Sequence, residues 1–541
     1  MRFILFNIFE RWRITAFAIA LFVIIPLAVV LFSFLYPAPE IWDHLIQNLL
    51  SDLLVNTLWL VIGISTVTAL LGVSLAWLTG VCDFPGRKFF SWALLLPLAM
   101  PTYVLAFVFL GLLDFSGPLQ TQLRLWFGPD NVPFPDVRST AGIIIVLSLA
   151  LYPYVYLIVR NAFMTQGVRT LEVAQSLGYG RVSGFFRIAL PMARPWIAGG
   201  LMLVMMEGLS DFGAVSIFNF DTFTTAIYKA WFGFFSITAA AQLSSILVLI
   251  VFIIIVLEQQ MRSKMRYYQP GRHSMKTHRF ELSEGKGWAA FAYSLFVLSI
   301  AFIIPLIQLV YWSFDSGGEE LNARYAGFLT HSLTLGIIAS FITCLCALLL
   351  SYAKRRHPDK MTAFFVRVST LGYALPGTIL AVGIFIPVAY MDNMISSAAL
   401  KLFNLETGPL LQGTLLVMVI AYLIRFMAAG FNSIDNSMQR ITKSIDEAPM
   451  VMGLKGVAML RRIHLPILRT GVFTAATLVF VDVMKEMPIT LMTRPFGWDT
   501  LAVKIYELTS EGEWERAALP ALTLILAGLV PVILLMRHSE K

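Results

Sequence analysis

The chain has little charge and almost no cysteine. Of its 541 residues, 13% are charged and three are cysteine, whereas a soluble domain carries about 25% charge. Cys82, Cys344 and Cys346 are too few, and too close to apolar segments, for a disulfide framework. Low charge combined with 58% hydrophobic residues excludes an ordinary soluble enzyme and predicts a polytopic membrane protein.

Motifs that mark common enzyme classes are also absent. The sequence contains no G-x-x-x-x-G-K-[ST] phosphate loop, no H-E-x-x-H zinc motif and no G-x-S-x-G elbow, and its seven histidines are scattered. We therefore expect no catalytic residue and no cofactor on this chain, and no hydrolysis of ATP by it. The residue pattern assigns no metal ligand.

The apolar residues form segments long enough to cross a bilayer, which takes about 20 residues. Twelve spans are predicted, at about 14–36, 53–79, 89–113, 140–163, 196–217, 236–257, 289–313, 330–353, 364–390, 410–432, 471–492 and 516–536. The first exceeds the roughly 7–15 apolar residues of a cleaved signal peptide, so we expect it to be retained as a helix. The predicted fold class is an all-α polytopic membrane protein.

Lysine and arginine concentrate in alternate loops. If both termini are cytoplasmic, the inside segments carry 31 of the 40 basic residues and the outside segments carry 8, while Lys485 lies in a span. The inside loops then include residues 160–194 and 425–469. This asymmetry predicts that both termini are cytoplasmic. The net charge of +8 thus reflects membrane topology, and we expect no nucleic-acid partner.

The sequence repeats itself at a constant offset in residue number, so that Leu58 corresponds to Leu333. Further pairs at this offset are Pro101 and Pro376, Gly178 and Gly453, Arg187 and Arg462, Pro191 and Pro466, and Thr225 and Thr500. We predict a first half over residues 1–261, a polar cytoplasmic linker over 262–287 and a second half over 288–541. Each half holds six spans, so both halves have the same orientation and a pseudo-two-fold axis along the membrane normal, with a pathway between them.

Each half also contains a long loop, at 164–195 and 433–470, in which Glu is followed by Gly six residues later and by Pro nineteen residues later. An acidic residue suits a helix N-terminus. The glycine then breaks the helix, and the proline marks the start of the next membrane helix. This pattern predicts a short helix–turn–helix along the membrane surface, a shape suited to docking in a groove of a partner.

The two loops resemble the EAA loop of permeases from binding-protein-dependent ABC importers. The family core is Glu-Ala-Ala, three residues, Gly, then Ile-x-Leu-Pro. This chain has Glu-Val-Ala and Glu-Ala-Pro at the first positions, and it keeps both glycines and both Ile-x-Leu-Pro elements. The resemblance implies the MetI-like, type I permease fold. It assigns coupling to an ATPase to Glu172, Ala174, Gly178, Leu190, Pro191, Glu447, Ala448, Gly453, Leu465 and Pro466.

The resemblance also implies partners. In that family the loop is a coupling helix held in a cleft of the ATP-binding subunit. It implies a dimer of such subunits at the cytoplasmic face, carrying the ATP and Mg that this chain lacks. A periplasmic solute-binding protein and a bacterial inner membrane, with its lipid, complete the expected assembly.

Four acidic residues and one lysine lie within predicted spans: Glu207, Asp211, Asp482, Lys485 and Glu486. Each acidic pair is four residues apart and is expected on one helical face. Because an acidic residue at mid-bilayer costs about 2.5–3.5 kcal/mol, these groups should face a cavity, the interface between halves or the periplasmic end. Two interpretations stay open. One is an acidic translocation pathway that favours cations, and the other is a structural network bridged by Lys485.

The segments SDFGAVSIF, DTFTTAIY and KEMPITLMTRPFGWDTLAVKIYE are similar to those of ferric-iron importer permeases, which are commonly fused chains of twelve helices. This similarity implies Fe(III) as the solute, and hard carboxylate oxygens suit a hard cation. Thiamine, polyamine and inorganic-anion permeases are alternatives. A proton-coupled secondary transporter, with Glu207, Asp211, Asp482 and Glu486 as the relay, leaves the paired loops unexplained. For a non-transporting scaffold or sensor, the sequence offers no extramembrane domain large enough to signal.

Overall fold

The chain folds almost entirely into helices. The computed structural model describes residues 11–36, 39–128, 134–167, 175–176, 178–263, 279–315, 322–442, 444–447, 454 and 456–539. In this part of the chain, eleven helices are long and apolar enough to cross a membrane, and they overlap eleven of the predicted spans. The twelfth predicted span lies within α26 (Trp514–Ser539), a helix of 26 residues. The predicted fold class is confirmed.

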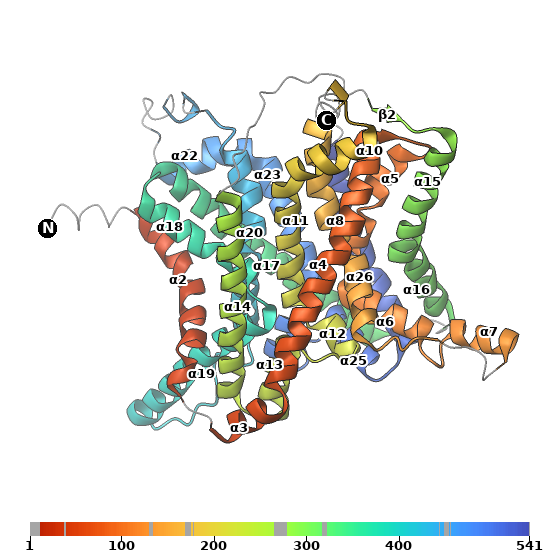
Figure 1. Ribbon diagram of the computed structural model, residues 1–541. Helices are drawn as coiled ribbons and strands as arrows, with labels where there is room; N and C mark the ends of the chain where they lie inside the picture. Colours follow the sequence, from red (N-terminus) through yellow and green to blue (C-terminus); the bar gives the residue numbers. More distant parts are fainter. Residues whose placement is uncertain are drawn as a thin grey trace. The chain divides into compact units, whose positions relative to one another are not determined.

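The helices form two compact units, each assembled from three stretches of chain. Unit 2 comprises His44–Thr225, Leu249–Glu320 and Ile505–Lys541. Its elements are α4 (Leu50–Val81), β1 (Cys82–Asp83), α5 (Arg87–Ala93), α6 (Thr102–Leu113), α7 (Pro118–Phe127), α8 (Thr140–Ala162), α10 (Arg181–Gly184), α11 (Leu190–Ser210), α12 (Gly213–Ile217), β2 (Phe280–Glu281), α15 (Glu284–Leu298), α16 (Ile304–Asp315) and α26. Helices α4, α8 and α11 pack side by side, and α16 packs against α26 (Figure 1).

Unit 1 comprises Met1–Asp43, Ala226–Val248 and Leu321–Lys504. Its elements are α2 (Arg11–Leu31), α17 (Ala323–Arg356), α18 (Lys360–Ser369), α19 (Gly377–Phe403), α20 (Leu415–Met438), α22 (Gly456–Met459), α23 (Leu465–Lys485) and α24 (Pro488–Thr493). Helices α17, α20 and α23 pack against one another. Among the described elements, four helices run from one unit into the other: α3 (Pro39–Asn48), α13 (Phe223–Tyr228), α14 (Ile237–Ser263) and α25 (Leu501–Ser510).

The element bounds agree with the predicted repeat. Helices α11 and α23 begin and end at positions related by the repeat offset, and α6 and α19 begin at such positions too. Two short 3₁₀ turns, Leu96–Ala99 and Leu371–Ala374, also coincide at this offset. At these positions the two halves of the sequence therefore specify the same local structure.

Two predicted spans, 89–113 and 364–390, are wrong as continuous helices. The first is divided into α5, a 3₁₀ turn and α6, and the second into α18, a 3₁₀ turn and α19. Each break ends at a proline, Pro101 or Pro376, which follows a residue with extended backbone. Proline disfavours the helical conformation of the residue before it, and this explains the break.

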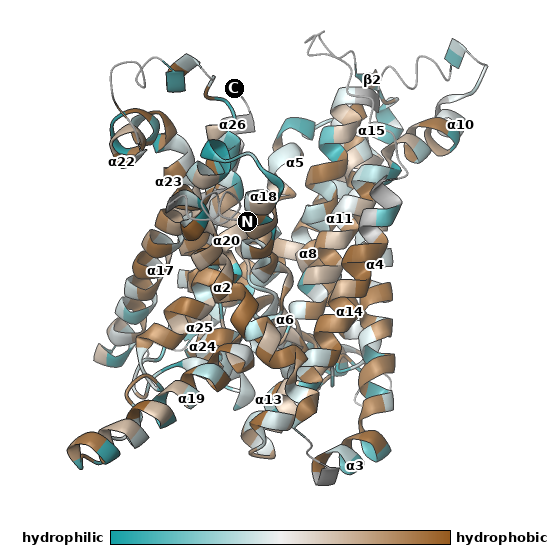
Figure 2. Ribbon diagram, turned by 90° about the vertical axis from the view of Figure 1, so that its left-hand side faces the viewer, coloured by the Kyte–Doolittle hydropathy of each residue, from teal (hydrophilic) through white to brown (hydrophobic). Residues whose placement is uncertain are grey.

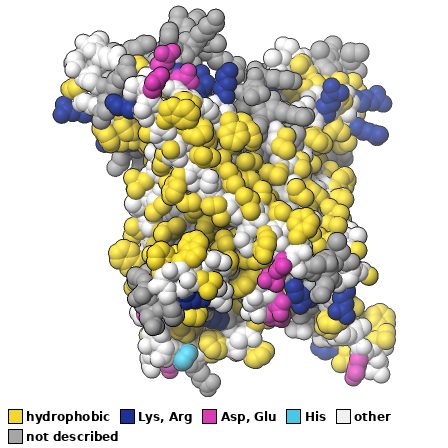
Figure 3. Space-filling view, turned by 90° about the vertical axis from the view of Figure 1, so that its right-hand side faces the viewer, with side chains coloured by type: hydrophobic (Ala, Val, Ile, Leu, Met, Phe, Trp, Pro, Cys, Tyr) yellow, Lys and Arg dark blue, Asp and Glu magenta, His cyan; other side chains and the backbone are white. Residues whose placement is uncertain are grey.

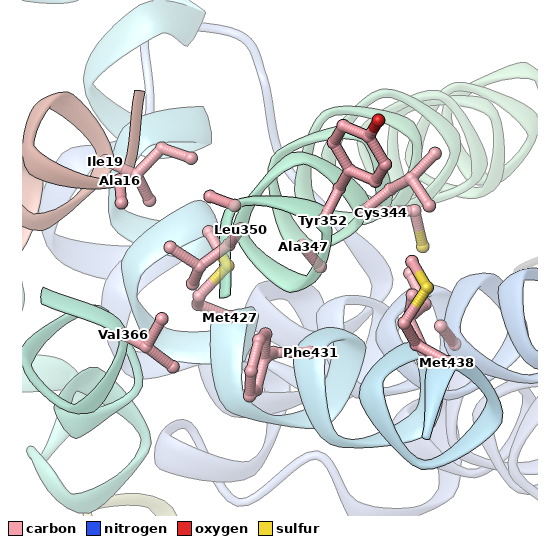
Figure 4. Packing of buried hydrophobic residues seen from close by; sticks show 14 of the residues in the cluster. Ala16, Ile19, Cys344, Ala347, Leu350, Tyr352, Val366, Met427, Phe431 and Met438 are labelled. Atoms are coloured by element: carbon pink, nitrogen blue, oxygen red, sulfur yellow. The ribbon is translucent and has the colours of Figure 1, made fainter. Parts of the chain in front are cut away.

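Helix α2 packs on helices from the second half of the sequence. Figure 4 shows Ala16 and Ile19 of α2 against side chains of α17, α18 and α20, among them Leu350 and Val366. Arg13 reinforces this contact through an ion pair with Asp359, 3.1 Å between Nη2 and Oδ2. Reciprocally, α15, α16 and α26 from the second half belong to unit 2. The compact units therefore cut across the predicted halves.

Apolar residues cover the long helices in the way that a lipid environment requires. Figure 2 shows hydrophobic residues along the length of α4, α11 and α14. On the face shown in Figure 3, charged side chains gather toward two ends, and apolar side chains fill the zone between them. Many large apolar side chains on this protein are exposed, including Trp59, Phe252 and Phe341, which suits contact with lipid tails.

The exchange of helices leads to a prediction about split chains. When residues 288–541 are expressed without residues 1–261, the core of unit 1 lacks α2, and its small-residue contacts with α17 and α19 are lost. We expect the isolated half to be degraded or to unfold at a lower temperature. Co-expression of the two halves should restore it, as measured by abundance in the membrane fraction. An isolated half as abundant and as stable as the co-expressed pair contradicts the prediction.

Candidate coupling segments and membrane carboxylates

The two segments predicted to couple to an ATPase are described in part. Outside the described residues lie Glu172, Ala174, Ala448 and Gly453. Within them lie Gly178, Leu190, Pro191, Glu447, Leu465 and Pro466. Both Leu-Pro pairs stand in the first turn of a membrane helix, α11 or α23, as predicted. Glu447 is exposed at the surface.

The first segment turns at Gly178. Its φ of +80° lies in the left-handed region, which favours glycine, so the predicted break in the helix is confirmed. The segment then continues through α10 and a π-helical turn into α11. An aromatic cluster holds it in place, because Trp77 of α4 lies 4.5 Å from Phe185 and 5.2 Å from Phe163, between ring centroids.

The second segment is held by charge instead of by aromatic rings. Arg355, in the last turn of α17, is ion-paired with Asp446, 2.7 Å between Nη2 and Oδ2. The same guanidinium donates to the backbone carbonyls of Met438, Ile441 and Thr442 at 2.9–3.2 Å. A single arginine thus fixes the end of α20 and the first residues of the segment.

A second ion pair and a buried histidine complete this network. Lys354 donates to Asp435 at 2.7 Å, and Nε2 of the buried His464 lies 3.1 Å from a carboxylate oxygen of Asp446. The His464 ring packs edge-on against Tyr352, whose hydroxyl donates to the Gly456 carbonyl at 3.2 Å. The predicted coupling segment of unit 1 is therefore held to both α17 and the helical run that continues into α23.

Asp211 lies just beyond the end of α11 and not within it. Its backbone is extended, with φ −66° and ψ 127°, so the prediction that Glu207 and Asp211 share one helical face is wrong. One carboxylate oxygen accepts hydrogen bonds from the backbone N–H groups of Ala214 and Val215, at 2.9 and 3.2 Å. The other accepts from the Thr102 hydroxyl at 2.5 Å. Asp211 thus caps α12 and ties it to α6.

Glu486 occupies the equivalent place at the end of α23, and it is also extended. Its Oε1 accepts from the N–H of Ile489 at 3.3 Å, at the start of α24. Its Oε2 lies 3.1 Å from Nε of Arg425, and Arg425 also donates to the Leu375 carbonyl at 3.0 Å. Glu486 is 7% exposed, so the guanidinium compensates a buried charge.

Asp211 and Glu486 both accept hydrogen bonds from the short helix that follows, but their side-chain partners differ. At the repeat offset, Thr102 corresponds to Gly377. A Cβ at Gly377 would lie 2.7 Å from Oε1 of Glu486 and 3.3 Å from the Arg425 guanidinium. The absence of a side chain there makes room for the longer Glu486 and its arginine, whereas the shorter Asp211 is reached by a threonine hydroxyl.

The remaining predicted pathway residues, Glu207, Asp482 and Lys485, are half-buried in α11 and α23. Asp482 and Lys485 are three residues apart on α23, so their opposite charges lie on neighbouring positions of the helix surface. A role of any of the five predicted residues in translocation stays a prediction. Within the described ranges, no group of three or more His, Cys, Asp or Glu is placed to hold a metal ion.

Two arginines that form these ion pairs, Arg355 and Arg425, were not predicted from the sequence. Arg425 falls both in the predicted span 410–432 and in the predicted loop 425–469, and the structure places it in α20, inside a candidate membrane span. For Arg355, the sequence indicates only a basic residue near the membrane surface. A signal for Arg425 existed, because the equivalent position in the first half holds the buried Ala150. A charged residue in one half, at a position where the other half has a buried apolar residue, indicates that the charge has a partner of opposite sign.

Comparison with known proteins places the chain in a family. The model of the family described as binding-protein-dependent transport system inner membrane component matches residues 70–267. A putative 2-aminoethylphosphonate transport system permease protein of Salmonella typhimurium is 30% identical over 214 residues, which are 39% of this chain and 73% of the relative. The chain belongs to this family of inner-membrane transport components.

Two other relatives of this permease show how far the similarity extends. An Fe(3+)-transport system permease protein of Haemophilus influenzae is 29% identical over 506 residues, 92% of each chain. A molybdenum transport system permease protein of Escherichia coli is 31% identical over 147 residues, 27% of this chain and 62% of the relative. The permease is thus a multi-pass inner-membrane protein of a binding-protein-dependent importer.

Proposed function

We propose that the chain is the permease subunit of an ATP-driven importer that moves Fe(III) from a periplasmic binding protein to the cytoplasm by alternating access. The observation that carries the proposal is the similarity to an Fe(3+)-transport permease along 92% of each chain. Such a match spans both halves, whereas the phosphonate and molybdenum relatives match only a part of this permease.

The proposed orientation places both termini and both coupling segments in the cytoplasm. The distribution of lysine and arginine supports it, since basic residues are enriched in cytoplasmic loops. A dimer of ATP-binding subunits, carrying ATP and Mg, then docks on the segments at 164–195 and 433–470. This permease contributes no residue to ATP hydrolysis in the proposal.

The structure of the segments suggests how a force on them reaches the membrane. Phe185–Ser210 and Gly456–Lys485 are each a continuous helical run, of 26 and 30 residues, that passes through a π-helical turn into a membrane helix. At 1.5 Å per residue, the longer run extends about 45 Å. Each run ends at a capping carboxylate, Asp211 or Glu486. A tilt of the segment thus moves the carboxylate end of the same rigid helix.

Alternating access then follows from a difference in affinity. ATP-bound subunits that bind one arrangement of the segments more tightly shift the equilibrium toward it, and hydrolysis removes that preference. We assign Glu207, Asp211, Asp482, Lys485 and Glu486 to the region where the moving helix ends meet the solute. Arg425 offsets Glu486, so the net acidity of this region is lower than the four carboxylates alone indicate.

Reconstitution tests the proposal directly. The permease is co-purified with its ATPase and binding protein, and ATP hydrolysis and uptake are compared for Fe(III), thiamine, polyamines, molybdate and 2-aminoethylphosphonate. We expect Fe(III) loaded on the binding protein to raise both rates. Stimulation by another solute alone rejects iron but retains the importer. Uptake driven by a proton gradient without any ATPase rejects ATP-driven import and favours a secondary transporter.

A further inference from the structure

A cluster of three arginines in unit 2 lies outside the features discussed so far. Arg160 stands in the last turn of α8, and Arg87 is the first residue of α5. Arg279 precedes β2, which pairs in parallel with β1 so that Cys82 lies opposite Phe280. A backbone hydrogen bond of 3.2 Å from Leu282 to Asp83 extends this pairing. The short ribbon thus brings Arg279 to the region of Arg87 and Asp83.

The cluster holds more positive than negative charge. Arg87, which is 9% exposed, donates from Nε to Asp83 at 2.9 Å. The Nε atoms of Arg160 and Arg279 are buried and have no hydrogen-bond partner among the described residues. Glu281, two residues beyond Arg279, is exposed to solvent. Arg279 is therefore close to two guanidinium groups and to one carboxylate, Asp83, which is already paired with Arg87. Arg160 and Arg279 each have an unsatisfied buried donor.

Burial and neighbouring charges both act on the Arg279 side chain. Burial lowers the pKa of Arg279, and the nearby charges of Arg87 and Arg160 lower it further, while Asp83 opposes them. Arginine stays protonated in proteins, so the consequence is not a neutral side chain. Unsatisfied donors and crowded positive charge instead make an anion favourable at this place.

At the equivalent place in unit 1, the positive and negative charges are balanced. At the repeat offset, Arg160 corresponds to Asp435 and Thr79 to Lys354. Asp435 and Lys354 form an ion pair of 2.7 Å within unit 1, so the charges there compensate each other. In unit 2 the aspartate is replaced by an arginine and the lysine by a threonine. Unit 2 therefore lacks the internal counter-charge that unit 1 has at this position.

The surroundings of the cluster indicate the level of the membrane surface. Phe89, two residues after Arg87, is 47% exposed, and Trp288, close to the start of α15, is 59% exposed. Exposed aromatic rings beside basic residues at helix ends are typical of the layer of lipid headgroups. Basic pockets between membrane helices on the cytoplasmic side commonly bind anionic headgroups.

We propose that Arg87, Arg160 and Arg279 bind a phosphate group at the cytoplasmic end of unit 2, supplied by an anionic phospholipid of the inner leaflet. The placement in that leaflet rests on the orientation given under the proposed function. Planar guanidinium groups suit phosphate because they donate two parallel hydrogen bonds to it. The bound lipid ties the end of α8, where the first coupling segment begins, to the β2 strand that follows the linker.

Lipid binding by the full-length chain tests this proposal without any transport assay. Purified protein in detergent is titrated with phosphatidylglycerol or phosphatidylcholine, and bound lipid is measured by native mass spectrometry. The variant R160Q/R279Q is compared with K360Q, which removes an exposed lysine from unit 1. We expect the double variant to bind phosphatidylglycerol about 30-fold more weakly than the natural chain, since each basic residue contributes about fivefold. K360Q should bind like the natural chain.

The other outcomes are also decisive. If inorganic phosphate at millimolar concentration displaces phosphatidylglycerol from the natural chain but not from R160Q/R279Q, the phosphate chemistry is supported directly. Equal binding of the two lipids by the natural chain, or equal phosphatidylglycerol affinity of the natural chain and R160Q/R279Q, overturns the proposal and points to a protein carboxylate as the missing counter-charge. If the double variant does not fold, R279Q alone, on the segment before β2, gives the same comparison with about a fivefold effect.

Discussion

Replacing Arg425 by alanine is expected to destabilise the permease by about 3–5 kcal/mol, because it leaves the buried Glu486 carboxylate without its counter-charge. The Leu375 carbonyl also loses a hydrogen bond. Thermal unfolding of the purified protein measures the loss. Arg440→Ala removes an exposed arginine just beyond the same helix and should change stability by less than about 0.5 kcal/mol.

The residues of unit 2 at the equivalent positions indicate how the stability lost in R425A can be recovered. The triple variant G377T/R425A/E486D installs in unit 1 the threonine, alanine and aspartate that unit 2 has at Thr102, Ala150 and Asp211. We expect it to recover most of the stability lost in R425A, because the shorter carboxylate then accepts from a threonine hydroxyl. A triple variant no more stable than R425A argues that the two ends are not equivalent solutions.

The second large effect is expected at Arg355. Its replacement by alanine removes the ion pair with Asp446 and three hydrogen bonds to backbone carbonyls. A partly buried charge network of this kind is worth about 2–4 kcal/mol, and the loss falls on the segment that we propose as the ATPase contact. We therefore expect uptake to fall at least about tenfold, because a loosened segment no longer moves α23 when the ATPase closes.

Comparison of two variants separates coupling from simple misfolding. In Arg355→Ala, ATP hydrolysis by the assembled importer should persist while its stimulation by loaded binding protein is lost. Lys360→Ala, an exposed residue in the next helix, should leave both rates unchanged. Arg355→Lys keeps the charge but not the planar fork, and should give intermediate uptake. Normal stimulated hydrolysis and uptake in Arg355→Ala would rule out the proposed role of this network.

Features that depend on local pattern were predictable from the sequence. The spans follow from apolar length, and the turn at Gly178 and the helix starts at Leu190 and Leu465 follow from Gly and Pro chemistry. Several element boundaries coincide at the repeat offset because the same local signals recur in both halves. Boundaries were less accurate where a helix is broken inside an apolar segment, as before Pro101.

Features that depend on distant partners were not predictable in the same way. Arg425 lies in the middle of α20 and Glu486 at the end of α23, and hydropathy does not indicate which residues of different helices meet. Asp211 was expected to lie on a helical face because its spacing from Glu207 fits one turn. In the structure α11 stops before Asp211, whose carboxylate accepts hydrogen bonds from the next helix. Comparing the two halves position by position exposes such sites better than hydropathy does.

Helix α2 is translated long before the helices on which it packs. Helix α2 ends at Leu31, but the helices that cover it begin only at Ala323. At about 5–20 residues per second, the nascent chain holds α2 in the membrane for roughly 15–60 s before its packing surface is translated. Its small residues Ala16 and Ala20, buried in the finished protein, have to wait throughout that interval for the helices that cover them. Helix α26, which is translated after the other elements of unit 2 named above, completes that unit.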